Sequence, residues 1–177
     1  MEALLPGETF QPRHTFQANS SRGTIERATS AAQIDEVRAL FLEYAASLGL
    51  NLCFQNFQSE LDGLPGSYAA PRGLLLLARS VPGEPAGCIG VRPFEESLCE
   101  MKRLYVRPQF RGTGLGRKLV ESALEWAVSA GYRAMVLDTI PGKMDSAIRL
   151  YRELGFVERP AYYQSPIEGT LYLEKRL

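Results

Sequence analysis

The residues with the clearest chemical potential form a glycine-rich loop: Arg111, Gly112, Thr113, Gly114, Leu115 and Gly116. The loop follows an apolar, strand-like run and precedes an amphipathic segment with helical spacing. Glycines leave backbone amides bare of side chains, and the N-terminus of the helix adds a positive dipole. Arg117 and Lys118 follow directly and add two positive charges. The segment therefore predicts a binding site for a phosphorylated small molecule.

The spacing of the glycines separates three kinds of phosphate loop. A dinucleotide loop needs Gly-x-Gly-x-x-Gly, and here the third position is Arg117, so that pattern fails. A Walker A loop has no match. The signature Gln/Arg-x-x-Gly-x-Gly/Ala is met at every position of 111–116. The structural alternative is a helix start with incidental glycines, but Gly116 would then weaken the first helical turn without a reason.

The scarcity of histidine removes whole classes of chemistry. The one histidine, His14, lies in a polar, irregular segment, so a Ser-His-Asp triad or a multi-histidine metal site is not expected. Three cysteines without metal-type spacing predict no metal, and Cys88 and Cys99 lie in apolar runs that are typical of free buried thiols. A general base must therefore be a carboxylate, a tyrosine, a thiol or a water.

The composition is that of an ordinary globular protein of 177 residues, with 45% hydrophobic and 23% charged residues. The 20 basic residues equal the 20 acidic ones, so no nucleic-acid or membrane partner is predicted. Neither a membrane-spanning run nor a signal peptide is recognised, and we expect a cytoplasmic protein. Residues 1–22 lack periodicity and are expected to form a flexible tail before one domain at 23–177.

The elements that must position the loop follow from periodicity and capping. Ser30 and Gln33 form a capping box before a helix that Gly49 ends. The expected helices cover 31–48, 55–61, 115–130 and 145–154. The expected strands are 24–29, 74–79, 86–91, 98–106, 134–138, 156–158 and 169–175, the second and third forming a hairpin that the fourth extends. This order predicts one mixed α/β domain.

Three sequence blocks, at 101–108, 111–116 and 144–156, resemble the GNAT superfamily of N-acetyltransferases in type and order. The order of elements resembles that family from about Ile25 to the C-terminus. The resemblance implies an α/β fold of the GNAT-like acyl-CoA N-acyltransferase type, a mixed sheet of seven strands splayed at its middle and flanked by helices. It also implies that acetyl-CoA lies in the split as cosubstrate.

The resemblance assigns the cofactor contacts. Amides of residues 111–116 would bind the pyrophosphate, and the backbone of Leu104, Tyr105 and Val106 would pair with the pantetheine arm. In the family an amide at the end of this strand also polarises the thioester oxygen. One position departs from the pattern: Met144 stands where many relatives have an asparagine that contacts CoA, and Ser146 is the candidate replacement.

The resemblance also assigns the catalytic groups. Tyr151 matches the family's general acid, and a phenol suits a thiolate leaving group; the alternative is a core aromatic residue at helical spacing. Glu100 matches a strand carboxylate that acts as general base in some members; the alternatives are a salt bridge with Lys102 for Glu100 and Asp138 as base. Strand alternation predicts that Glu100, Lys102 and Leu104 share one face, with Met101, Arg103 and Tyr105 on the other.

The acceptor pocket is expected between the first helices, from residues 53–58, 64–68 and 71–73. Acidic groups there (Glu43, Glu60 and Asp62) would attract a cationic amine, whereas Arg72 and Arg92 would bind a substrate carboxylate. The predicted function is direct acetyl transfer from acetyl-CoA to a primary amine of a small molecule or amino acid derivative. The rival is a non-catalytic acyl-CoA-binding or sensory module, which needs neither Tyr151 nor Glu100. Family members are often dimers, so a homodimer is one expectation.

Overall fold

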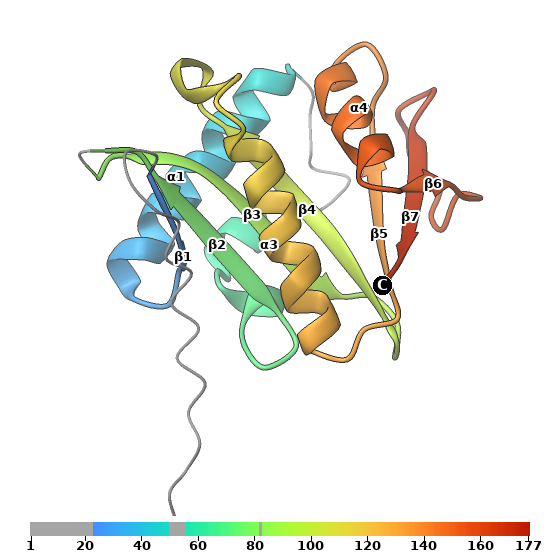
Figure 1. The fold of residues 1–177 in the computed structure, drawn as a ribbon, viewed down its shortest axis with the longest axis horizontal. Helices are drawn as coiled ribbons and strands as arrows, with labels where there is room; N and C mark the ends of the chain where they lie inside the picture. The colour runs from blue at the N-terminus through green and yellow to red at the C-terminus, as the bar shows by residue number, and fades with distance from the viewer. Residues whose placement is uncertain (1–22, 50–55, 82) are drawn as a thin grey trace, which may run out of the picture.

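The computed structural model describes residues 23–49, 56–81 and 83–177, so the predicted tail, His14 and residues 53–55 of the expected acceptor region lie outside it. Within the described residues seven strands form one sheet in the order β1-β2-β3-β4-β5-β7-β6. Helices cover both faces of this sheet (Figure 1). The predicted mixed α/β architecture is confirmed.

The first four strands are antiparallel neighbours: β1 (Thr24–Arg27), β2 (Leu74–Arg79), β3 (Pro85–Pro93) and β4 (Leu98–Val106). The hairpin of β2 and β3 is thus as predicted. β5 (Ala134–Thr139) joins β4 in parallel, β7 (Leu171–Arg176) is antiparallel to β5, and β6 (Val157–Glu158) is antiparallel to β7. β6 is shorter than expected, because its pairing with β7 covers only two residues.

The helices α1 (Ala31–Leu48), α2 (Phe57–Asp62), α3 (Leu115–Ser129) and α4 (Asp145–Glu153) divide between the two faces, with short 3₁₀ turns η2 (Gly66–Tyr68) and η3 (Pro108–Phe110). α1 begins at the predicted capping box, in which the Gln33 amide donates to Ser30 Oγ at 3.3 Å. It ends at Gly49 in the left-handed conformation. α1 and α2 enclose one apolar cluster against the sheet, and α3 and α4 enclose the other.

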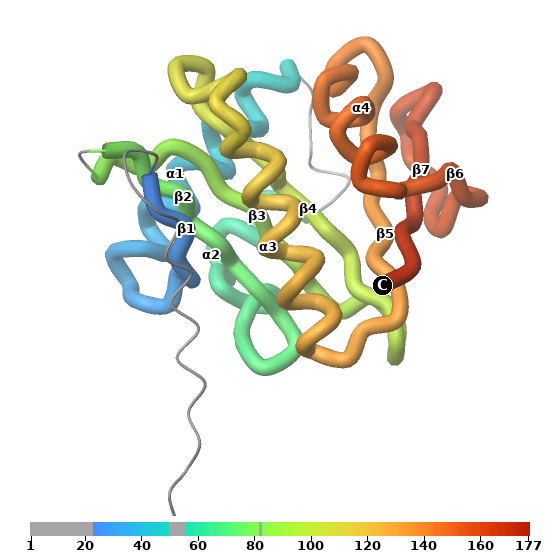
Figure 2. Tube along the Cα trace, in the orientation of Figure 1, coloured from blue at the N-terminus to red at the C-terminus, as the bar shows by residue number. Residues whose placement is uncertain are grey.

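The sheet opens at its centre, between β4 and β5. These parallel strands pair through three residue pairs, from Leu98–Ala134 to Glu100–Val136. Beyond them the strands diverge, and Figures 1 and 2 show the gap widening toward the N-terminal ends of α3 and α4. The splayed sheet that the resemblance implied is therefore present.

A bulge in β4 overturns one prediction. Cys88 pairs with Tyr105 and Gly90 with Lys102, so β4 carries one extra residue between these pairs. Arg103 takes up the extra length in the left-handed region, at φ 60°. One inserted residue reverses the alternation of side chains beyond it. Leu104 therefore packs with Met101 on the α3 side of the sheet, and Tyr105 faces α1. The prediction that Leu104 shares a face with Lys102, and Tyr105 a face with Met101, is wrong.

Candidate active site

The glycine-rich loop connects η3 to α3 in a shape that only glycine adopts easily. Gly112 and Gly114 have φ of 75° and 82°, in the left-handed region, and Gly114 is the N-cap of α3. Between them, Thr113 Oγ1 donates to the Phe110 carbonyl at 2.8 Å and holds the turn. The loop thus presents backbone at the positive end of the α3 dipole, as an anion site requires.

Gly116 needs a different explanation, because it lies inside the first turn of α3 and its φ is not positive. A methyl group at this position would meet only the Val106 side chain, at 3.8 Å, which is ordinary contact. Neither backbone conformation nor packing within the described residues therefore requires glycine here. The space in front of Gly116 is open to a ligand that approaches the backbone closely.

That space is a groove of about 420 Å³, within the usual range for small-molecule sites. We call it the loop groove. It lies between the glycine-rich loop, the end of β4 and the first turns of α4. The predicted cofactor residues that line it are Leu104, Tyr105, Val106, Arg111, Gly112, Gly114, Leu115, Gly116, Arg117 and Ser146. The structure thus brings together most of the residues that the sequence assigned to CoA.

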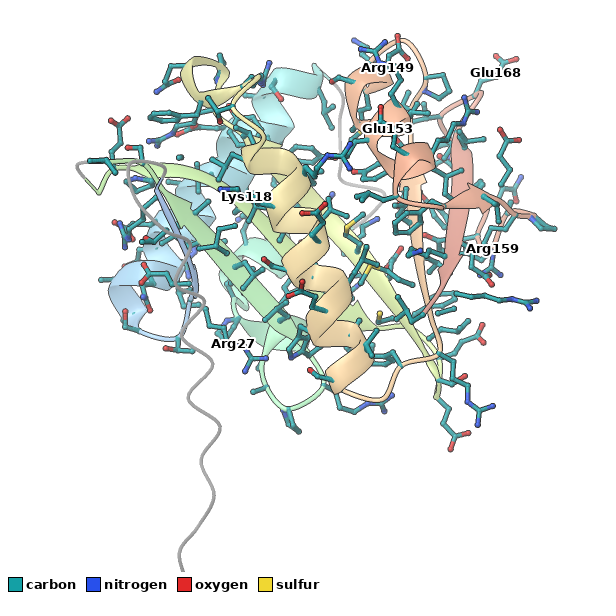
Figure 3. The ribbon with its side chains drawn as sticks, viewed as in Figure 1. Arg27, Lys118, Arg149, Glu153, Arg159 and Glu168 are labelled. Atoms are coloured by element: carbon teal, nitrogen blue, oxygen red, sulfur yellow. The ribbon has the colours of Figure 1, made fainter. Side chains whose placement is uncertain are left out.

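Two predicted cofactor residues do not line the loop groove. Thr113 instead closes the turn described above, and Lys118 projects from the side of α3 that faces away from α4 (Figure 3). Arg117 lines the groove and also forms an ion pair with Glu153 of α4, which links the two helices beside the split. Met144 lines the groove too, and the Thr139 hydroxyl donates to its sulfur at 3.5 Å.

Tyr151 does not line the loop groove itself. It lines a small cavity of about 30 Å³ in the split between β4 and β5, which we call the split cavity. This cavity shares Tyr44, Leu48, Leu104 and Met144 with the loop groove, so the two adjoin. Burial raises the pKa of the Tyr151 phenol well above its ordinary value, and the charge of Asp138 adds to the rise. Tyr151 therefore stays protonated at neutral pH; its ring also packs on Phe156, so it is a core residue as well.

Glu100 lies apart from Tyr151, in the wall of a cavity of about 640 Å³ on the α2 side of the sheet, which we call the acceptor cavity. Its side chain is buried and accepts hydrogen bonds from Arg92 Nε at 2.8 Å and the Tyr162 hydroxyl at 2.9 Å. Lys102 Nζ lies 3.6 Å from Glu100 Oε1, so Glu100 and Lys102 form the ion pair that was one alternative from the sequence. Lys102 lines both the acceptor cavity and the split cavity and is where they meet.

Asp138, the alternative base, lines the split cavity together with Tyr151. Lys102 Nζ contacts its Oδ1 at 2.6 Å, and the Tyr163 hydroxyl donates to its Oδ2 at 3.1 Å. Burial raises the pKa of Asp138, but the charge and hydrogen bond of Lys102, helped by Tyr163, outweigh burial and place it below the ordinary value. The two candidate bases thus lie on either side of one buried ammonium group.

We expect Asp138→Asn to lower the free energy of unfolding by about 3 kcal/mol at pH 7, because it leaves the Lys102 ammonium buried without its nearest carboxylate. Urea unfolding measures this. The stabilisation is complete above the carboxyl's ordinary pKa of 3.8 and is lost as the pH falls below it. The wild type should therefore lose more stability than the variant between pH 5 and pH 2.5. Asp62→Asn, which alters an exposed hydrogen bond with Gln58, is the control; equal effects of the two changes would contradict the account.

Several residues around the acceptor cavity were not found from the sequence. Arg103, at the bulge, binds Glu60 through Nε at 3.0 Å and Nη2 at 2.6 Å, and the Tyr68 hydroxyl donates to the same carboxylate at 2.7 Å. Tyr162 and Tyr163 come from the segment between β6 and β7, which has no periodic pattern. Only contacts across the fold reveal these residues.

Of the residues that the sequence assigned to the acceptor pocket, some line the acceptor cavity and others do not. Glu60 and Arg92 line the acceptor cavity, together with residues 65–68. Glu43 instead forms an ion pair with Arg107 at 2.7 Å. Arg72 donates to the Glu96 carbonyl at 3.1 Å and does not line the acceptor cavity.

Residues 23–49, 56–81 and 83–177 contain no group of three side chains able to hold a metal ion. In the same part of the chain no helix combines the length and apolar character needed to cross a membrane. Cys88 and Cys99 are free and buried, as predicted.

Comparison with known proteins places these features in context. A sequence model of the Acetyltransferase (GNAT) family matches residues 35–156. An uncharacterised N-acetyltransferase of Schizosaccharomyces pombe is 40% identical over 141 residues, which cover 79% of this chain and 86% of that protein. Human N-acetylaspartate synthetase is 35% identical over 121 residues, which cover 67% of this chain and 40% of that protein.

Solved structures agree with the sequence relatives. A candidate acyl-CoA N-acyltransferase from Klebsiella pneumoniae has 29% identity and a TM-score of 0.70, covering 89% of this chain and 99% of that one. A GNAT-family acetyltransferase from Staphylococcus aureus has a TM-score of 0.73 over 87% of this chain and 98% of that one. Its identity is 18%, so this second likeness concerns the fold alone.

Proposed function

The chain belongs to the acetyltransferase (GNAT) family and is an N-acetyltransferase, and on that premise we propose that it moves the acetyl group of acetyl-CoA directly to a primary amine of a small molecule. The observation that carries the proposal is that the loop groove and the split cavity adjoin, with Tyr44, Leu48, Leu104 and Met144 in the walls of both. The glycine-rich loop lines the groove, and the buried phenol of Tyr151 lines the cavity beyond it. This order of groups matches a cosubstrate with a pyrophosphate at one end and a thioester at the other.

The backbone performs most of the binding. Amides of residues 111–116 and the α3 dipole would hold the pyrophosphate. Leu104, Tyr105 and Val106 lie beyond the last β4–β5 pair, so their backbone on this edge is turned toward the split instead of a partner strand. They would pair with the pantetheine arm as an added strand does. The amide of Tyr105 or Val106 would polarise the thioester carbonyl.

The side chains move the protons. An amine must lose its ammonium proton before it forms the C–N bond, and the thiolate released as the C–S bond breaks needs a proton. Tyr151 would donate that proton to sulfur, and Glu100 would take the proton of the amine, directly or through water. Lys102 lies between the two cavities, and its buried charge disfavours a second cation, which assists deprotonation of the amine.

A small acceptor is supported by the volume of the acceptor cavity, about 640 Å³, within the usual range for small-molecule sites. N-acetylaspartate synthetases are among the relatives, so free amino acids are the first acceptors to examine. The test follows release of CoA from acetyl-CoA across a panel of amines, with identification of the N-acetyl product by mass spectrometry. Transfer to at least one amine is expected. Tight binding of acetyl-CoA without transfer to any amine would instead favour the non-catalytic module.

The choice of base has its own test. We expect Glu100→Gln to lower kcat/KM for the amine by about 10²–10⁴-fold, the usual contribution of a general base, with unchanged affinity for acetyl-CoA. The measurement is steady-state kinetics at saturating acetyl-CoA, with binding measured by calorimetry. Asp138→Asn is the comparison variant, scored at a temperature where it is folded. A larger loss in Asp138→Asn than in Glu100→Gln would identify Asp138 as the base.

Two expectations about the whole chain remain predictions. Limited proteolysis should cut within residues 1–22 and leave 23–177 as a stable domain. Light scattering should give the mass of a homodimer. A uniform resistance of the N-terminal segment, or a monomer mass, would contradict the respective prediction.

A further inference from the structure

The carboxylates of the acceptor cavity are already engaged by the protein. Glu60 is held by Arg103 and by the Tyr68 hydroxyl, and its side chain is 9% exposed. Glu100 is 3% exposed and accepts from Arg92 and Tyr162. These two anions are therefore paired with neighbouring groups, so the charge of the ligand does not bind to them, and Glu100 would take the proton of the amine through water.

The charge that the cavity does expose is the guanidinium of Arg92. Its side chain is 33% exposed, against 5% for Lys102, the other cation in the cavity wall. Arg92 binds Glu100 Oε2 through Nε at 2.8 Å and Nη2 at 2.7 Å. A guanidinium has five N–H donors arranged as a fork, so this contact leaves donors for a second acceptor. A carboxylate is the ligand that such a fork binds best.

The position of Arg92 also limits the length of the ligand. An acceptor amine has to enter the split beside Lys102, because Lys102 lines both the acceptor cavity and the split cavity. Arg92 and Lys102 contact opposite oxygens of the same Glu100 carboxylate. A molecule that reaches from Arg92 to the split is therefore short.

From these contacts we propose that the acceptor is a short amino carboxylate, an amino acid or a dipeptide, whose carboxylate binds Arg92 while its amino group enters the split beside Lys102. This assignment rests on the acetyl transfer proposed above and adds the substrate class. Aromatic rings of Tyr68, Phe94 and Tyr162 line the remainder of the cavity and would contact the substrate's side chain. Arg92 is on this account a specificity-determining residue.

The experiment compares acceptors that differ only at the carboxylate. Each free amino acid or dipeptide is paired with its C-terminal amide, and kcat/KM is measured for both at saturating acetyl-CoA. The wild type should prefer the carboxylate over the amide by at least tenfold. Arg92→Met should reduce this preference to a ratio of about one, because it removes the charge-assisted contact with the carboxylate. Arg92→Lys should retain part of the preference, and the KM for acetyl-CoA should be the same in all variants.

The ratio of kcat/KM for each acid to that for its amide reports recognition of the carboxylate alone. A general disturbance of the site, such as a shift of Glu100, would lower both values equally and leave the ratio unchanged. Arg72→Met is the matched control: this arginine binds a backbone carbonyl outside the acceptor cavity, so its loss should leave the ratio unchanged. Equal rates for acids and amides in the wild type, or an equal loss of both in Arg92→Met, would overturn the carboxylate site. Acetyl-CoA binding with no transfer to any amine would overturn the proposed function, and this inference with it.

Discussion

Tyr151→Phe should lower kcat by about 10²–10⁴-fold and leave the affinity for acetyl-CoA unchanged. The substitution removes only the hydroxyl group, the proposed proton donor to the thiolate. The ring remains, with its packing on Phe156 at 5.8 Å between centroids, so the fold should persist. The volume of the split cavity should change little, and the loop groove, where most of the cosubstrate is expected to bind, is untouched.

Steady-state kinetics and calorimetric titration with acetyl-CoA test this prediction together. Because burial raises the pKa of Tyr151, the wild-type rate should show no loss from ionisation of this phenol between pH 7 and pH 9. Tyr132→Phe is the matched control, a buried tyrosine whose hydroxyl donates to the Arg72 carbonyl at 2.8 Å, away from the split. It should alter stability but not kcat. An unchanged kcat in Tyr151→Phe would contradict the role of Tyr151 as general acid and would show that it serves only as a core aromatic residue.

Gly116→Glu should weaken the binding of acetyl-CoA by about 100-fold or more. The new carboxylate would project into the loop groove, where the pyrophosphate is expected, and like charges about 4 Å apart near a protein surface repel by several kcal/mol. The fold itself should tolerate the change. Acidic side chains are favourable in the first turn of a helix, and any residue other than proline has a higher helix propensity than glycine.

The affinity is measured by calorimetry and the thermal midpoint by differential scanning fluorimetry on the same samples. Val128→Glu adds the same charge to the last turn of α3, at a position 56% exposed and outside the groove, and should leave the affinity unchanged. Gly116→Ala is the graded step, since its methyl group would meet Val106 at ordinary contact distance. Unaltered affinity in Gly116→Glu, with the midpoint retained, would mean that the pyrophosphate lies elsewhere.

Local signals explain why much of this fold was predictable from the sequence. The capping box at Ser30 and the apolar spacing that follows depend on residues within a few positions of one another, and α1 has the expected limits. The glycine-rich loop is also local: positive φ at Gly112 and Gly114 follows from the turn into α3. Such features leave a pattern in the chain before any tertiary contact forms.

The bulge at Arg103 left no such pattern. An inserted residue is defined only by its partner strand, here the segment from Cys88 to Gly90, so strand alternation read from β4 alone gave the wrong faces for Leu104 and Tyr105. The charge network was hidden for a related reason. Arg103 is 43 positions from Glu60, and Tyr162 is 62 positions from Glu100, so nothing in the sequence linked them.

The acceptor region shows the same limit. Acidic residues near the first helices suggested an anionic pocket for a cationic amine. Glu60 proved to be neutralised by Arg103, and Glu43 by Arg107, because buried or half-buried carboxylates in a folded chain acquire cationic partners. Arg92 remained partly exposed in the cavity wall, and this favours the other expectation from the sequence, that Arg92 binds a substrate carboxylate.

A crystal structure of the full chain with acetyl-CoA tests most directly whether the cosubstrate binds in the split between β4 and β5. We expect the pyrophosphate at the amides of residues 111–116, the pantetheine arm along Leu104–Val106, and the thioester sulfur within hydrogen-bond distance of the Tyr151 hydroxyl. Cosubstrate bound outside the loop groove, or a thioester remote from Tyr151, would contradict the account.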